Sequence, residues 1–392
     1  MSGIYIHIPF CKQACHYCNF YFTTSKGNKD KLIDAICAEI AARADFLPNR
    51  DLKTIYFGGG TPSFIDLDDL KKIMSSIQSI YELKNLEEVT LEANPDDITY
   101  EKLAGWRDLG INRLSIGVQS FEDRELTLMN RSHQAAQAEQ SILIAQDAGF
   151  DNISIDFIYG LPASTQESWT KNLEKAIQLG IKHLSCYSLT VKEKTKLMKM
   201  VDRGNIAMID ESLNIQQYQW MIEYLTSQGY EQYEISNFAA EQAYSVHNTN
   251  YWSEVPYLGI GPSAHSFDGQ RRRWNIANNL NYIEGVTQDK EYFEEEWLTE
   301  ENKYNEYILT KLRTKWGISP SEIKSRFGLD ISNILEREIR KGNVELNSLN
   351  QIVLSQQGKL IADAVSLEFI RDIQDLTGTH NNKSLSKMCV NA

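Results

Sequence analysis

The sequence predicts an α/β fold: a partial TIM-type barrel of six strand–helix units, (β/α)6, followed by a C-terminal winged-helix-like helical module. Six short apolar runs alternate with six longer runs of helical periodicity, which is the pattern of a parallel sheet with helices outside. Polar residues gather where the apolar runs end. The chain has 392 residues, of which 42% are hydrophobic, so it can bury the core of more than one domain.

The six units are read from the change of periodicity along the chain. The expected strands are 3–8, 53–57, 87–92, 112–117, 152–157 and 182–187. The expected helices are 29–47, 66–80, 99–109, 134–148, 166–179 and 211–228. In the first helix one apolar stripe indicates packing against a sheet; it consists of Leu32, Ile33, Ile36, Cys37, Ile40 and Ala44.

The position of polar residues favours a barrel over an open doubly wound sheet. Each expected strand ends in, or is followed by, residues able to bind a ligand: Tyr5, His7, Gly58–Gly60, Glu92, Gln119, Asp156 and Tyr187. In a barrel these ends meet at one face, whereas a doubly wound sheet would gather only those near a switch point. The doubly wound sheet stays the alternative.

The chain divides into four expected parts. Residues 1–235 form the barrel domain, and 236–300 form a connecting region that is rich in aromatic residues and contains HNTNYW. Its acidic end, 289–301, is expected to be a solvated surface connection. Residues 301–372 form the winged-helix-like domain, with helices at 302–316, 319–327 and 331–341, strands at 344–347 and 351–355, and a helix from 358. Residues 373–392 are polar and are expected to form a loose tail.

Composition limits the classes of function. The formal net charge of −13 argues against a general nucleic-acid binder, and the C-terminal module lacks a basic recognition helix, so we expect a structural or partner-binding role for it. No apolar run reaches the roughly 20 residues of a membrane span, and the N-terminus does not have the pattern of a secretory signal. We therefore expect a cytoplasmic protein whose six cysteines serve metal binding or catalysis rather than disulfides.

Three cysteines form a metal-binding motif. Cys11, Cys15 and Cys18 follow a C-x3-C-x2-C spacing. Zinc is one candidate, with His7 or His16 as the fourth ligand that a structural zinc requires. A [4Fe–4S] cluster is the other: it is usually held by four cysteines, so three would leave one iron open to a substrate or cofactor. The remaining cysteines are expected in the core (Cys37 and Cys186) and in the tail (Cys389).

The motif and its surroundings resemble the radical SAM family that contains oxygen-independent coproporphyrinogen III dehydrogenase and the haem chaperone HemW. The resemblance covers nearly the whole chain, through IYIHIPFCKQACHYCNF, GGGTP, EANPD, GVQSF, DFIYGLP and HNTNYW. It implies a [4Fe–4S] cluster on the three cysteines, with S-adenosylmethionine (SAM) on the open iron. It also implies that an electron from the cluster cleaves SAM to a 5′-deoxyadenosyl radical, chemistry that the cofactor carries.

The resemblance implies a set of SAM-binding residues, each of which has a structural alternative. Tyr5 and Tyr17 would pack beside the cluster and adenine, or simply within the strand and loop. Gly59, Gly60 and Thr61 would bring backbone close to the methionine part of SAM, or form a plain turn. Glu92 could accept both ribose hydroxyls and complement the sulfonium. Polar positions of the family's pocket are matched by Gln119, Arg131 and Asp156, which could instead tie loops together.

Two functions from different classes follow from the resemblance. The dehydrogenase carries a further cysteine two positions after the third, and here that position is Phe20. Chaperones of the HemW type have the three-cysteine form and an H-N-x-x-Y-W motif, matched here from His247 to Trp252. We therefore favour a haem chaperone, with His247 as the axial ligand of haem iron and His265 as a second candidate. The resemblance implies that it passes haem to client haem proteins, which include respiratory ones near the membrane. The sequence leaves open whether SAM is cleaved catalytically.

Overall fold

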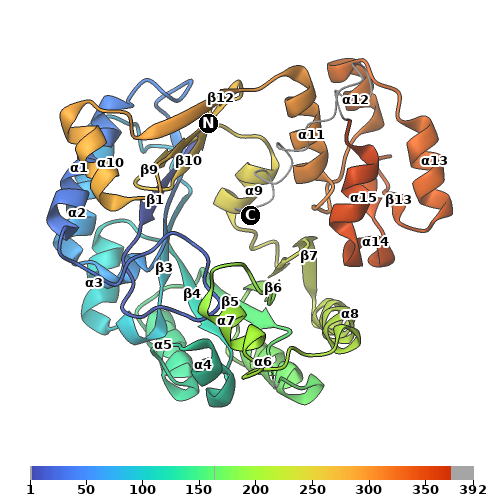
Figure 1. Cartoon of the computed structure of the whole chain (residues 1–392), viewed down its shortest axis with the longest axis horizontal. Coiled ribbons are helices and arrows are strands. Elements are labelled where there is room, and N and C mark those ends of the chain that lie inside the picture. Colours follow the sequence, from blue (N-terminus) through green and yellow to red (C-terminus); the bar gives the residue numbers. More distant parts are fainter. Residues whose placement is uncertain (1, 163, 372–392) are drawn as a thin grey trace. The chain divides into compact units, whose positions relative to one another are not determined.

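The computed structural model describes residues 2–162 and 164–371, and the expected tail lies outside the described residues. The chain forms two compact units, divided between Trp297 and Leu298. The first unit contains the large sheet and the second a small helical module (Figure 1). Each unit is described by itself below.

The first unit is built on six parallel strands that follow one another in sequence order. These are β1 (Ser2–Ile8), β2 (Leu52–Gly59), β3 (Glu88–Ala93), β4 (Arg113–Gln119), β5 (Ile153–Tyr159) and β6 (His183–Ser188). The helices between them are α1 (Lys29–Ala42), α2 (Leu67–Gln78), α3 (Tyr100–Asp108), α4 (Asp123–Met129), α5 (Ala135–Asp147) and α6 (Gln166–Gln178). Because the strand order has no switch point, the prediction of a partial barrel is confirmed and the doubly wound alternative is wrong.

Local sequence explains where these helices begin. Asp66 and Asp69 form a capping box at the start of α2, and Thr165 forms one at the start of α6. Two seven-residue helices, α4 and α7 (Lys196–Asp202), were not expected from the sequence. Helix α8 (Glu211–Ser227) lies where a helix was expected.

Further strands, most of them antiparallel to their neighbours, extend the sheet at both edges. Beyond β6 lie β8 (Asn237–Ala240) and β7 (Tyr230–Glu234). Beyond β1 lies the parallel strand β9 (Tyr257–Ile260), followed by β10 (His265–Phe267), β11 (Arg271–Asn275) and β12 (Phe293–Trp297). The acidic segment was expected to be a surface connection, but its middle is strand β12, paired with β11 through Arg272 and Glu296. The two remaining helices of this unit are α9 (Val246–Trp252) and α10 (Asn279–Gln288).

The second unit contains the helices and hairpin that the sequence indicates. Its elements are α11 (Glu300–Lys311), α12 (Pro320–Phe327), α13 (Ser332–Arg340), β13 (Val344–Leu346), β14 (Ile352–Leu354), α14 (Gln356–Leu360) and α15 (Ala362–Phe369). Strands β13 and β14 pair antiparallel as a hairpin. Within the described residues, no helix combines the length and the hydropathy that crossing a membrane would need.

The inner face of the barrel holds the polar residues that matter for function. Helices α1 to α6 cover the outer side of the curved sheet, and α9 lies on the opposite, inner side (Figure 1). Side chains alternate along a strand, so Thr54 and Tyr56 of β2 share the inner face, while Ile55 and Phe57 are buried under the helices. The inner face has two ends: the loop after β1 carries the cysteines, and α9 contacts the starts of β2 and β3.

Candidate cluster and cofactor site

The cysteine loop is anchored at the end of β1. Its first cysteine, Cys11, donates its backbone N–H to Thr23 (2.9 Å), and Thr23 donates in turn to Pro9 (2.7 Å). The middle of the loop is tied to the end of α4, where the His16 N–H reaches the Met129 carbonyl at 3.0 Å. All three cysteines, Cys11, Cys15 and Cys18, stay partly exposed.

Burial makes two of these thiols, those of Cys11 and Cys18, poor acids in the absence of a metal. It raises the pKa of Cys11 to about 11 and that of Cys18 to about 12. Thiolate ligation therefore needs a strongly positive group between them. In the part of the chain that the structure describes, no three His, Cys, Asp or Glu side chains are close enough to chelate a single ion.

Two candidate residues contact the cysteines directly. The Thr61 hydroxyl donates to the Cys11 sulfur at 3.5 Å. Arg131 places Nη1 3.4 Å from both the Cys15 sulfur and the Tyr17 hydroxyl. Its Nη2 donates at 2.7 Å to Asn94 Oδ1 and at 2.7 Å to a backbone carbonyl of β4. The structure thus brings Thr61, Tyr17 and Arg131 to the cysteine loop, and Arg131 also braces the end of the neighbouring strand.

Glu92 lies one residue before the end of β3 and points to the turn after β2. One carboxylate oxygen accepts a hydrogen bond from the Tyr56 hydroxyl at 2.9 Å, and the other accepts one from the Gly59 N–H at 3.1 Å. A Cβ at Gly58 would lie 2.9 Å from Glu92 and 2.9 Å from Tyr5. Glycine at this position is therefore required for the close approach of these side chains.

Asp156 lies near Glu92 on the inner face, and burial raises the pKa of both carboxyl groups. The Ser115 hydroxyl donates to Asp156 at 3.3 Å. Burial, reinforced by Asp156, raises the pKa of Glu92 to about 7; burial, opposed by Arg113, raises the pKa of Asp156 to about 6. Both side chains keep part of their surface accessible, so a ligand can reach them. Two such carboxylates suit a cationic ligand, and SAM carries a sulfonium and an ammonium group.

Gln119 has an unusual backbone conformation at the end of β4. Its φ is 66°, in the left-handed region that favours glycine, and the pairing of β4 with β5 shifts register between Ile116 and Gln119. Such strain persists only where the surroundings enforce it, and it is concentrated at functional sites. The Gln119 amide and the Arg131 guanidinium both lie against Gly117, where a Cβ would be 3.0 Å from Gln119 Nε2 and 3.2 Å from Arg131 Nη2.

The two histidines considered as zinc ligands have other partners. His7 places Nε2 3.0 Å from the Tyr21 carbonyl, so this nitrogen donates, and Nδ1 then accepts from the Tyr5 hydroxyl at 3.2 Å. His16 donates Nδ1–H to the Leu128 carbonyl at 2.8 Å, and its Nε2 is buried without a partner. His7 thus fixes the position of Tyr5, which the sequence alone did not indicate.

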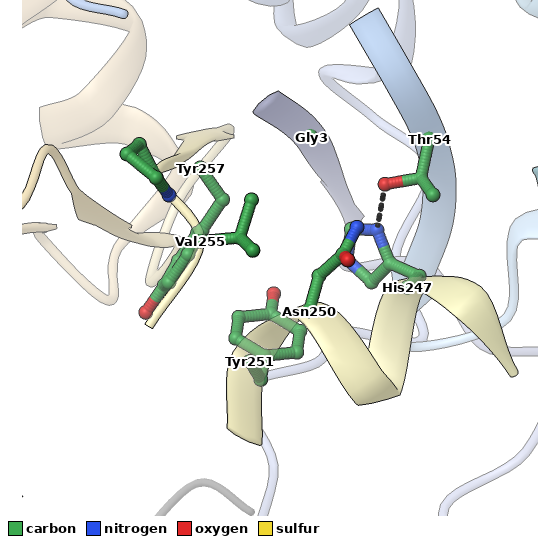
Figure 2. Close-up of a pocket in the computed structure, with 8 residues that line it drawn as sticks. Gly3, Thr54, His247, Asn250, Tyr251, Val255 and Tyr257 are labelled. Atoms are coloured by element: carbon green, nitrogen blue, oxygen red, sulfur yellow. Dashed lines mark hydrogen bonds between the residues drawn. The ribbon is translucent and has the colours of Figure 1, made fainter. Parts of the chain in front are cut away.

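His247 lies at the other end of the barrel from the cysteines. Its Nδ1 is 2.8 Å from the Thr54 hydroxyl, near the start of β2, and its ring stacks on Tyr56 with centroids 4.9 Å apart. Figure 2 shows the ring beside Thr54, with Tyr251 and Tyr257 across a small pocket. Nε2 is buried without a partner, and burial, aided by Arg113, lowers the pKa of His247 to about 3. The second haem-ligand candidate, His265, stacks on Trp274 in the sheet extension.

Sequence reasoning missed three residues of the inner face. Tyr56 links Glu92 to His247, Asn94 receives Arg131, and Arg113 is the buried cation near Asp156. The sequence could have indicated Tyr56, because it lies two residues before Gly58 in the same strand and therefore faces the same side of the sheet. The partners of Asn94 and Arg113 are distant in sequence, and nothing local points to them.

Comparison with known proteins identifies first the superfamily and then the family of this chain. Residues 5–176 match the model of the radical SAM superfamily, the class of protein that a partial barrel with a three-cysteine loop after its first strand defines. The chain is 34% identical to the haem chaperone HemW of Bacillus subtilis, over 95% of this chain and 100% of that protein. It is 31% identical to HemW of Lactococcus lactis, over 95% and 98% of the two chains. The chain belongs to the HemW family of the radical SAM superfamily.

A solved structure has the same fold. The coproporphyrinogen III oxidase HemN of Escherichia coli, described as a radical SAM enzyme, superposes with a TM-score of 0.80 over 94% of this chain and 89% of its own. The identity is 23%, so the likeness concerns the fold alone.

Proposed function

We propose that this protein is a haem chaperone: it binds a [4Fe–4S] cluster, SAM and haem, and it delivers haem to client haem proteins. Cys11, Cys15 and Cys18 would hold the cluster. Glu92, Asp156, Gln119, Arg131 and Tyr17 would surround SAM, together with Tyr5 and the turn Gly59–Thr61. Bound together, the reduced cluster and SAM supply one-electron chemistry that protein side chains lack.

Each side chain near the cofactors has a task that follows from its contacts. Arg131 donates from Nη1 toward the Cys15 sulfur and would hold this ligand in place. Glu92 and Asp156 offer negative charge to a cationic ligand from adjacent parts of the inner face. The hydrogen bond that the Tyr5 hydroxyl donates to His7 Nδ1 holds Tyr5 in one orientation.

The observation that carries the haem assignment is the hydrogen bonding of the His247 ring. A histidine that binds a metal donates one ring N–H to a protein acceptor and keeps the other nitrogen free. His247 fits this pattern, with Nδ1 at Thr54 and Nε2 without a partner. His16 and His133 share the pattern, and His247 in addition lines the pocket beside α9. Its low pKa keeps the ring neutral, as ligation of haem iron requires. The names of the relatives support the same assignment.

A haem titration tests this function. Haemin added to the purified protein is expected to shift the Soret band, and His247→Ala is expected to weaken both the shift and the affinity. His133→Ala is the matched control, because His133 is also buried, donates one ring N–H to a β4 carbonyl and keeps its other ring nitrogen without a partner, but it does not line the pocket beside His247. His265→Ala tests the second candidate ligand. An unchanged spectrum and affinity in His247→Ala would remove this residue from the site.

The dehydrogenase alternative is tested separately. The protein with its cluster, incubated without oxygen with coproporphyrinogen III, SAM and a reductant, is expected to leave the porphyrinogen unchanged. Phe20 stands where the dehydrogenase has its further cysteine, and its side chain is 58% exposed. Formation of protoporphyrinogen would contradict the chaperone assignment.

A further inference from the structure

The side chain of His247 is almost completely buried in the structure. The side chain is 2% exposed, with Tyr56 on one face of its ring and the Tyr251 edge 5.0 Å away. The adjacent pocket is too narrow to admit even a water molecule, and it is lined by Gly3, Thr54, His247, Asn250, Tyr251, Val255, Pro256 and Tyr257 (Figure 2). Pockets for small organic ligands usually measure about 300–1,000 Å³. Haem, a large ligand, does not fit beside Nε2 while α9 stays in place.

Two residues of the barrel hold α9 in this position. Glu88, at the start of β3, is 2% exposed and accepts hydrogen bonds from the Val246 N–H at 2.8 Å and the His247 N–H at 3.0 Å. The Ser245 hydroxyl approaches the same carboxylate at 3.4 Å. Thr54 provides the other contact, through the His247 ring. The Glu88 carboxylate and the Thr54 hydroxyl thus attach the start of α9 to β3 and β2, and Tyr233 of β7 adds a hydrogen bond to the Ser245 backbone.

The helix itself contributes little to its own stability. It has seven residues, and helices this short are not stable in water without tertiary contacts. The chain on either side departs from ordinary backbone conformation: φ is 52° at Glu241, 60° at Gln242 and 55° at Glu254. These left-handed residues are places where backbone strain is relieved if the segment between them moves. The position of α9 therefore depends on its contacts with Glu88, Thr54 and the aromatic residues.

We infer that haem reaches His247 only after α9 leaves the end of the barrel, and that Glu88 and Thr54 hold the closed state. This inference rests on the proposed haem site at His247. The protein would then alternate between a closed form that shields the ligand and an open form that presents Nε2 together with Tyr251. Haem capture and release would be limited by this movement rather than by encounter with haem.

Rapid mixing of haemin with the full-length protein tests the opening step. In the wild type, the rate of Soret formation is expected to level off as the haemin concentration rises, because opening precedes binding. Thr54→Val removes one hydrogen bond and leaves Glu88 with its partner Arg113, 3.8 Å away. It should raise the plateau about 5-fold, the factor for one net hydrogen bond. Glu88→Gln should raise it as well. Glu125→Gln is the matched control, a buried carboxylate that binds Ser120 and Ser168 instead.

Hydrogen exchange gives a second readout that does not use haem. The amides of Val246 and His247 are expected to exchange faster in Thr54→Val and Glu88→Gln than in the wild type and in Glu125→Gln. A Soret rate that rises linearly with haemin, is equal in all four proteins and depends on His247 would overturn the opening step alone. A missing Soret shift in the wild type, or one insensitive to His247→Ala, would overturn the proposed haem site and this inference with it.

Discussion

At the scale of single residues, the carboxylates of Glu92 and Asp156 are the main electrostatic feature of the inner face. Burial raises the pKa of each, with values of about 7 and about 6. A buried acid with a raised pKa favours its neutral form in the folded state. Ionisation therefore destabilises the fold unless a cation is bound nearby.

The pH dependence of stability follows from the sign of this shift. Unfolded Glu92 ionises near pH 4.5 and the folded residue near pH 7, so its contribution to the free energy of unfolding falls between these values. We predict that Glu92→Gln reduces this loss by about 2 kcal/mol in the metal-free protein. Urea unfolding of wild type and variant at pH 5 and pH 8 measures the difference. Glu82→Gln, on the surface, is the control; equal pH dependence in wild type and Glu92→Gln would contradict the assignment.

Gln119 allows strain and ligand binding to be separated. Replacement by glycine removes the penalty of its positive φ, so Gln119→Gly should raise the free energy of unfolding by about 1 kcal/mol. Gln119→Ala keeps the strained backbone and should not gain this stability. Both variants lose the side chain, so both should bind SAM more weakly, as equilibrium binding to the cluster-loaded protein can measure. Gain of stability in the alanine variant would refute the strain argument.

The spacing of Cys11, Cys15 and Cys18 is local and therefore visible in the sequence, whereas Thr61 and Arg131 were predicted only because the family resemblance implies them. Sequence reasoning also named His247, but not its place at the far end of the barrel. That place depends on Thr54 and Glu88, which are 193 and 159 residues away in sequence. Contacts at such separations leave no periodic signal.

At the scale of elements, α1 joins the barrel to its sheet extension through one buried carboxylate. Glu39 was not part of the predicted stripe, yet it is fully buried. It accepts hydrogen bonds from the Gly261 N–H at 2.9 Å and the Tyr282 hydroxyl at 2.7 Å, and it pairs with Arg43 at 3.2 Å. Asn275 of β11 donates to it at 2.9 Å. The helix therefore fixes the loop after β9, strand β11 and helix α10 together.

Removal of this carboxylate should be costly. Glu39→Ala leaves the buried Arg43 without its charge partner, for which we expect a loss of about 3–5 kcal/mol in the free energy of unfolding. Glu139→Ala breaks a more exposed pair with Lys175 and should cost less than about 1 kcal/mol. Chemical unfolding of both variants measures the contrast. Similar losses would show that Glu39 has no special role.

The sheet extension could not be predicted from local pattern. Strands β10 to β12 have three to five residues each, and two of them read RRRWN and FEEEW. These strands lack the alternation of apolar and polar residues that identifies a half-buried strand. Pairing of arginines on β11 with glutamates on β12 stabilises them instead, as between Arg271 and Glu295 at 2.9 Å.

At the scale of the whole molecule, the first unit contains every residue proposed to bind the cluster, SAM and haem. The cysteine loop lies at one end of the barrel interior and α9 at the other. Tyr56 contacts both sets of residues, through Glu92 and through His247. The two proposed sites are therefore joined by one layer of side chains.

The central claim is that Cys11, Cys15 and Cys18 hold a [4Fe–4S] cluster whose open iron binds SAM. The most direct test is anaerobic reconstitution, with iron and sulfide analysis and electron paramagnetic resonance of the reduced protein with and without SAM. We predict about four irons and four sulfides per chain, a spectrum that changes on addition of SAM, and loss of the cluster in each cysteine-to-serine variant. Zinc without sulfide, or a cluster that survives these substitutions, would contradict the assignment of a [4Fe–4S] cluster to these cysteines.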